Sequence, residues 1–146
     1  MLVYGIGYEG RDPHQFVATL RASGVEVLVD VRLNASSRRR GFAKTALREA
    51  VEAAGIDYLH VRELGNERDN RDGFADLSGS RAARARDRYR AHLTNGSSPA
   101  VDEVLEVIRE RPAALLCVER DERHCHRQIL IEHLQDLEPK LVAVPL

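Results

Sequence analysis

One short run of the chain, residues 115–130, holds most of the side chains that could do chemistry. It reads LLCVERDERHCHRQIL: an apolar start, a polar middle and the beginning of a helical pattern, so we expect a strand, a loop and a helix. Ligands of α/β proteins bind just beyond the carboxyl ends of parallel strands. The run therefore predicts a functional site. Its candidate residues are Cys117, Glu119, Cys125, His126 and Arg127.

The two cysteines are expected to play different parts. Cys125 falls in the first turn of the expected last long helix, where the helix dipole and neighbouring cationic side chains favour a thiolate, so it is a candidate nucleophile. Cys117 falls within the expected strand and is predicted to be a buried core residue, because a free cysteine behaves as a small hydrophobe. Glu119 is a candidate for acid/base chemistry or for holding Arg127.

Zinc binding is the alternative use of these residues, because Cys117, Cys125, His124 and His126 could supply four ligands. The spacing matches neither a zinc knuckle nor a zinc ribbon. His124 and His126 are two positions apart and would diverge on a helix, and Cys117 would come from within a strand. We therefore expect no metal, and the sequence names no cofactor.

Apolar runs alternate with helical patterns along the whole chain. Strands are expected at residues 2–6, 25–31, 56–61, 113–118 and 141–144. Helices are expected at residues 13–23, 43–54, 80–93, 99–110 and 124–137. This alternation predicts a three-layer α/β/α fold with right-handed crossovers and a mostly parallel central sheet of about five strands. Only residues 62–79 show little periodicity.

Length, charge and cysteine content narrow the class of protein. A chain of 146 residues fits one domain, residues 1–146, that needs no disulfide for stability. Its net charge of -1, from 22 basic and 23 acidic residues, excludes a global electrostatic field for nucleic acid or membrane. With no secretory leader and no long apolar segment, we expect a cytoplasmic protein with reduced thiols and no membrane partner.

Polar side chains follow the first two expected strands. The sequence GIGYEG places Gly7 and Tyr8 where a phosphate-binding turn would lie, although glycines in a tight strand-to-helix turn are the simpler interpretation. Asp30 ends the second strand, and a buried carboxylate there needs a cationic partner, for which Arg32 is expected. A catalytic role for Asp30 is the alternative. Parallel pairing would bring these positions to one edge of the sheet.

Arginines are concentrated in two further segments. Ser37 and Arg38 belong to the sequence NASSRRRG, whose hydroxyls and guanidinium groups suit phosphate or carboxylate oxygens, although a solvated basic loop is the alternative. The expected helix at residues 80–93 carries several arginines beside Tyr89, which could stack on a nucleic-acid base. Pairing of these arginines with Glu67 or Asp87 is the simpler interpretation.

Four stretches of the chain, YGIGYEGRDPHQF, VLVDVRLNASSRRRGF, GIDYLHVRELGNERDNRDGF and LLCVERDERHCHR, together resemble the family named Domain of Unknown Function 488. The chain departs from the family pattern at Ala35 and Arg40, where proline is common, and at Tyr8, where histidine is common. The resemblance implies an α/β fold and a site that includes the matching motif residues. These are Asp30, Val31, Arg32, Ser37, Arg38, Phe42, Leu64, Gly65, Asn70, Arg71, Cys125, His126 and Arg127.

The predicted site consists of two sets of residues. The candidate catalytic residues are Asp30, Glu119 and Cys125. The candidate ligand contacts are Gly7, Tyr8, Arg32, Ser37, Arg38, Asn70, Arg71, His126 and Arg127.

Three functions compete. The first is a hydrolase or transferase, or a binding protein, for a phosphorylated or nucleotide-like ligand. The second is thiol chemistry with Cys125 as nucleophile, His126 as its partner and Cys117 as a resolving thiol. The third is a nucleic-acid adaptor that uses the arginine-rich helix. A buried ion network without function is the remaining interpretation, and the chain is also compatible with a homo-oligomer.

Overall fold

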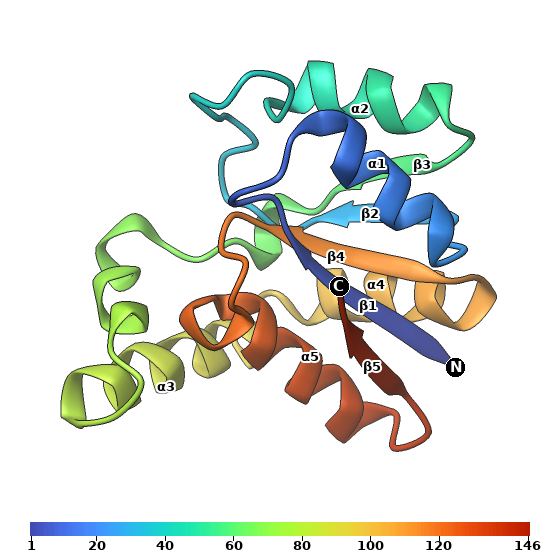
Figure 1. Cartoon of the computed structure of the whole chain (residues 1–146). Coiled ribbons are helices and arrows are strands. Elements are labelled where there is room, and N and C mark those ends of the chain that lie inside the picture. Colours follow the sequence, from blue (N-terminus) through green and yellow to red (C-terminus); the bar gives the residue numbers. More distant parts are fainter.

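The structure, a computed structural model, describes residues 1–146. A five-stranded sheet lies between two layers of helices (Figure 1), and all its strand pairs are parallel. The strand order is β3-β2-β4-β1-β5. The predicted three-layer α/β/α fold is therefore confirmed.

Each expected strand and helix is present, with small shifts at its ends. The strands are β1 (Leu2–Gly7), β2 (Val27–Asp30), β3 (Asp57–His60), β4 (Ala113–Cys117) and β5 (Val142–Pro145). The α-helices are α1 (Pro13–Ala22), α2 (Lys44–Ala53), α3 (Ser80–Thr94), α4 (Ser98–Glu110) and α5 (His126–Leu137). The short 3-10 helices are η1 (Arg62–Leu64), η2 (Arg68–Asn70), η3 (Asp72–Ala75) and η4 (Glu122–His124).

The two central strands β2 and β4 are buried along their whole length, which explains their almost continuous apolar sequences. Helices α1 and α2 cover one face of the sheet, and α3, α4 and α5 cover the other (Figure 1). Side chains alternate between the two cores along each strand, as Leu115 and Leu116 show. None of the helices has the length and apolar character needed to span a membrane.

Because all five strands run in the same direction, the segments that follow them meet at one edge of the sheet. At this edge the loop after β2 lies beside the 3-10 helices after β3 and the loop after β4 (Figure 1). The segment 62–79, which showed little periodicity, forms three of the four 3-10 helices. The predicted convergence of the strand ends is therefore present.

A buried ion pair closes the carboxyl end of β2. The Arg32 guanidinium donates from Nε and Nη2 to both carboxylate oxygens of Asp30, at 2.9 and 2.7 Å, and both side chains are almost fully buried. Arg32 also donates from Nη1 to the Phe42 carbonyl at 2.7 Å, and the Tyr58 hydroxyl donates to Asp30. The Asp–Arg pair expected from the sequence is present, and its atoms are satisfied within the protein.

Substitution of Asp30 tests the importance of this pair. Asp30→Asn leaves the buried Arg32 without its counter-charge, and we expect a loss of about 3 kcal/mol or more in the free energy of unfolding. The matched control is Asp57→Asn, which removes an exposed ion pair with Arg111 and should cost less than about 1 kcal/mol. Urea denaturation of both variants measures the difference, and equal losses would show that the buried pair is not structurally important.

Candidate functional site

A cavity of about 330 Å³ lies at the carboxyl edge of the sheet. Its walls come from the segments after β2, β3 and β4, but not from the segment after β1. A volume in this range holds a small molecule. The residues that line it are Arg32, Leu33, Asn34, Ser36, Asn66, Arg68, Arg71, Phe74, Cys117, Val118, Glu119, His124, Cys125 and His126.

The cavity brings together some of the predicted residues and leaves others outside. Those that line it are Arg32, Arg71, Glu119, Cys125 and His126. Cys117, expected to be an ordinary core residue, also lines it because it is the last residue of β4 rather than a residue in mid-strand. The predicted site residues outside the cavity are Gly7, Tyr8, Asp30, Ser37, Arg38, Asn70 and Arg127.

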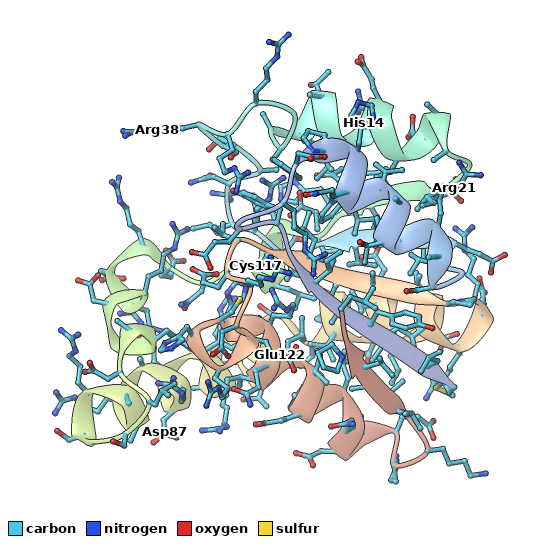
Figure 2. The ribbon with its side chains drawn as sticks, viewed as in Figure 1. His14, Arg21, Arg38, Asp87, Cys117 and Glu122 are labelled. Carbon is cyan, nitrogen blue, oxygen red and sulfur yellow. The ribbon has the colours of Figure 1, made fainter.

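Three buried side chains form a compact cluster at the cavity wall. The Sγ atoms of Cys117 and Cys125 and one ring nitrogen of His126 lie within 4.8 Å of one another. His126 Nδ1 is 3.9 Å from Cys117 Sγ and 3.7 Å from Cys125 Sγ. The cysteines are free thiols that are 5% and 2% exposed. Figure 2 shows Cys117 near the end of β4, in the interior of the molecule.

The orientation of the His126 ring follows from its other nitrogen. Nε2 lies 2.9 Å from the backbone carbonyl oxygen of Val31, which can only accept a hydrogen bond. Nε2 must therefore carry a proton and donate it. This contact holds the ring so that Nδ1 faces the two sulfur atoms.

The protonation states of the three side chains depend on one another, because the groups are buried and in contact. A hydrogen bond from Cys125 lowers the pKa of Cys117 well below its ordinary value. Burial raises the pKa of Cys125 well above its ordinary value, and the charge on Cys117 adds to this effect. Burial is the largest single influence on His126 and lowers its pKa, but the charge and hydrogen bond of Cys117, the Val31 carbonyl and the charge of Glu119 together outweigh burial and raise the pKa of the imidazole.

Cys125 lies at the start of α5 as its N-cap rather than inside the first turn. Its Sγ accepts a hydrogen bond from the backbone N–H of Arg127 at 3.4 Å. The Arg127 guanidinium lies next to the same sulfur, with Nη1 at 3.9 Å from it. The helix start and the guanidinium therefore both present positive charge to Cys125.

Glu119 and Arg127 do not interact as expected. Arg127 Nη2 donates to the backbone carbonyl of Glu119 at 3.0 Å, not to its carboxylate, and Nε faces Glu122 at 3.7 Å without a hydrogen bond. The expectation that Glu119 holds Arg127 through its side chain is wrong, because the backbone of the loop reaches the guanidinium first. The Glu119 carboxylate lines the cavity instead, where burial raises its pKa.

The arginines predicted to contact an anion separate into two groups. In the first group the guanidinium is buried and already bound within the protein. Arg32 donates to Asp30 and to the Phe42 carbonyl, and Arg127, which is 1% exposed, donates to the Glu119 carbonyl. Arg71 is exposed at the cavity and donates only through Nε, to the Asn66 carbonyl, so its terminal nitrogens are free. Arg68 is also exposed and lines the cavity. Arg68 and Arg71 form no ion pair with any acidic side chain.

The segment after β1 has a packing role. Tyr8 stacks on Phe42 with ring centroids 4.6 Å apart, and its hydroxyl donates to Ser37 Oγ at 3.1 Å. A Cβ at Gly7 would collide with the backbone of Glu119, so glycine is required for close packing of two chain segments. Arg38 extends from its loop into solvent (Figure 2). These residues surround the site but do not line its cavity.

Asn66 was not among the expected contacts. It is 4% exposed, lines the cavity, and accepts a hydrogen bond from Asn70 Nδ2 at 2.9 Å. The same Nδ2 atom donates to the Ala85 carbonyl at 2.9 Å, so Asn70 holds Asn66 against α3, and a contact of Asn70 with a ligand stays a prediction. The only feature of the sequence that pointed to Asn66 as a cavity residue is its position directly after Leu64 and Gly65, in the segment that follows β3.

The arginine-rich helix α3 does not expose the ring of Tyr89 on which a nucleic-acid base could stack. Tyr89 is 1% exposed and its hydroxyl donates to the Leu64 carbonyl at 2.6 Å. The expectation that Tyr89 stacks on a base is therefore wrong, because the ring is part of the core. Arg90 pairs with Asp87 at the surface, as the simpler interpretation expected, whereas Arg88 pairs with Asp69 rather than with Glu67 or Asp87. Nucleic-acid binding through the other arginines stays a prediction.

Comparison with protein families gives one match. The model of the family described as Domain of unknown function DUF488 matches residues 12–134. The chain belongs to this DUF488 family. The match contains every segment that lines the cavity. Searches of curated proteins and of solved structures gave no match.

Asn70→Ala tests whether the Asn66–Asn70 contact supports the DUF488 site. The substitution removes the donor to two buried oxygens, and we expect a loss of about 1–2 kcal/mol in the free energy of unfolding. The control is Asn95→Ala, at an exposed asparagine that should change the stability little. Urea denaturation measures both variants. Equal stability of Asn70→Ala and the unmodified protein would contradict a supporting role.

Proposed function

We propose that the chain is an enzyme that hydrolyses or transfers a group of a small anionic substrate, of the phosphorylated or nucleotide-like class. The observation that carries the proposal is that one cavity is lined by free cationic side chains, a carboxylate and a thiol–imidazole cluster. Ion pairing inside the protein occupies many of the other arginines, but Arg68 and Arg71 are free to bind an anion from outside.

The arginines at the cavity fit the recognition of phosphate. A guanidinium group can donate two parallel hydrogen bonds to phosphate or carboxylate oxygens, and Arg71 keeps both terminal nitrogens available. Asn34 and Ser36, from the loop after β2, add polar side chains to the lining. The cavity therefore offers both the charge and the hydrogen-bonding groups that an anionic substrate requires.

Glu119 is the proposed acid/base group. Its half-buried carboxylate lines the same cavity as the arginines, so a substrate bound there would lie within its reach. As a general base it would take a proton from an attacking water or hydroxyl, and as a general acid it would protonate the leaving group. Positive charge from Arg68 and Arg71 would stabilise negative charge that develops on the substrate.

A thiol-based reaction is the second candidate, and the position of Cys125 favours it. Its sulfur accepts a hydrogen bond from the first turn of α5 and lies next to the Arg127 guanidinium, and both contacts act against the burial that raises the pKa of this thiol. In this alternative His126 would be the proton partner of the nucleophile. Covalent labelling of Cys125 by a substrate-like electrophile, detected by intact mass, would favour it over acid/base catalysis by Glu119 alone.

Arg71→Gln tests the anion site. We expect binding of the phosphorylated ligand to weaken about tenfold or more, because a charge-assisted hydrogen bond is lost. The matched control is Arg38→Gln, which removes an exposed arginine outside the cavity and should leave the affinity unchanged. A thermal-shift screen with inorganic phosphate, sugar phosphates and nucleoside monophosphates first identifies a ligand. Calorimetry then measures the affinity of the unmodified protein and of both variants for it.

Two results would contradict the proposed function. One is the absence of any thermal shift across the whole panel. The other is an equal loss of affinity in Arg71→Gln and Arg38→Gln, which would indicate non-specific attraction by surface charge. In the proposed reaction, Glu119→Gln should keep the affinity for ligand and lose turnover of any substrate that the screen identifies.

A further inference from the structure

We propose that Cys117, Cys125 and His126 bind one zinc ion, with a free coordination position that opens into the cavity beside Glu119. This inference deepens the proposed function, on whose cavity it rests, because it assigns a metal to the wall of the same site. Sequence spacing argued against a four-ligand site with His124, and the structure indeed places His124 outside the cluster, with Nδ1 against the Phe74 carbonyl.

The spacing of the three atoms matches zinc coordination. Tetrahedral zinc, with Zn–S distances of about 2.3 Å and Zn–N distances of about 2.0–2.1 Å, places sulfur and nitrogen about 3.6 Å apart. His126 Nδ1 lies 3.7 Å from Cys125 Sγ and 3.9 Å from Cys117 Sγ, and the three atoms are mutually within 4.8 Å. Small side-chain adjustments would place all three in the coordination sphere of one ion.

Hydrogen bonds alone do not explain this arrangement well. Nδ1 has a single site in the ring plane, occupied by either a lone pair or a proton, so it cannot make two good hydrogen bonds at once. Cys117 Sγ and Cys125 Sγ nevertheless lie at nearly equal distances from it. One ion at the centre of the triangle would interact with all three atoms.

The surroundings of the cluster resemble those of a metal site in proteins. Ligating histidines usually donate their second ring N–H to a carbonyl or carboxylate, and His126 Nε2 donates to the Val31 carbonyl at 2.9 Å. Cys125 Sγ accepts the backbone N–H of Arg127, which would stabilise a metal-bound thiolate. Two thiolates also neutralise the charge of a divalent ion, so a buried ion would not be left uncompensated.

The number and position of the ligands point to a catalytic zinc rather than a structural one. Structural sites use four protein ligands, whereas catalytic sites use three and keep a position for water or substrate. All three proposed ligands line the cavity that also contains Glu119. Zinc at such a position supplies an activated water or polarises a substrate oxygen. Soft sulfur ligands with one imidazole favour zinc over magnesium or calcium.

The test is the zinc content of the full chain, purified under reducing conditions in zinc-containing medium and dialysed without a chelator. We expect one zinc per chain by elemental mass spectrometry and two sulfur and one nitrogen ligands by zinc X-ray absorption. His126→Gln and Cys125→Ser should lose the ion. The matched control His124→Gln changes a histidine that lines the same cavity outside the cluster and should keep it.

The wild-type protein provides a test that does not depend on the folding of variants. Titration of metal-free protein with Co²⁺ should produce thiolate-to-cobalt charge transfer and the intense visible bands of four-coordinate cobalt. Absence of both bands together with absence of zinc would overturn the inference, as would full zinc retention in His126→Gln. Because no substrate is used, these results are independent of the ligand screen, so either proposal can fail without the other.

Discussion

The site depends on one hydrogen bond between distant parts of the chain, from His126 Nε2 to the Val31 carbonyl. It joins the first residue of α5 to the residue that follows β2, and these belong to opposite halves of the sequence. The carbonyl can only accept, so the ring must present its other nitrogen to the two sulfur atoms. Cys117 is positioned by the end of β4 and Cys125 by the N-cap of α5. Without this contact the imidazole would have no fixed orientation toward the two sulfur atoms.

Close packing of backbone segments holds the cavity around this cluster. Gly7 allows β1 to approach the loop that carries Glu119, and Gly65 allows the segment after β3 to approach Leu33 after β2, because a Cβ at either position would collide with backbone atoms. The Asp30–Arg32 pair fixes the end of β2 between these contacts. Gly7, which suggested an anion-binding turn, therefore shapes the site indirectly, because it lets β1 pack closely against the loop that carries Glu119.

The sequence was sufficient for the fold class, because apolar runs and helical periodicity specify the succession of strands and helices along the chain and favour parallel pairing. It did not indicate the order of the strands within the sheet, β3-β2-β4-β1-β5. It also indicated that Glu119, Cys125 and His126 lie at the carboxyl edge of the sheet. It did not indicate Asn66, because residues 62–79 form 3-10 helices without a periodic pattern. Nor could it show which arginines are free, since Arg32 and Arg71 look alike until their partners are known.

Nitrogen NMR of the His126 imidazole tests the central claim of this account most directly, because the claim concerns which ring atom faces the sulfurs. Protein labelled with ¹⁵N in its histidines would be compared with His126→Gln to assign the signals. The account predicts that Nε2 carries a slowly exchanging proton that is hydrogen-bonded to the Val31 carbonyl, and that this proton stays on Nε2 when added zinc shifts the Nδ1 signal. A ring protonated on Nδ1 alone, with Nε2 unprotonated, would contradict the geometry on which the site is built.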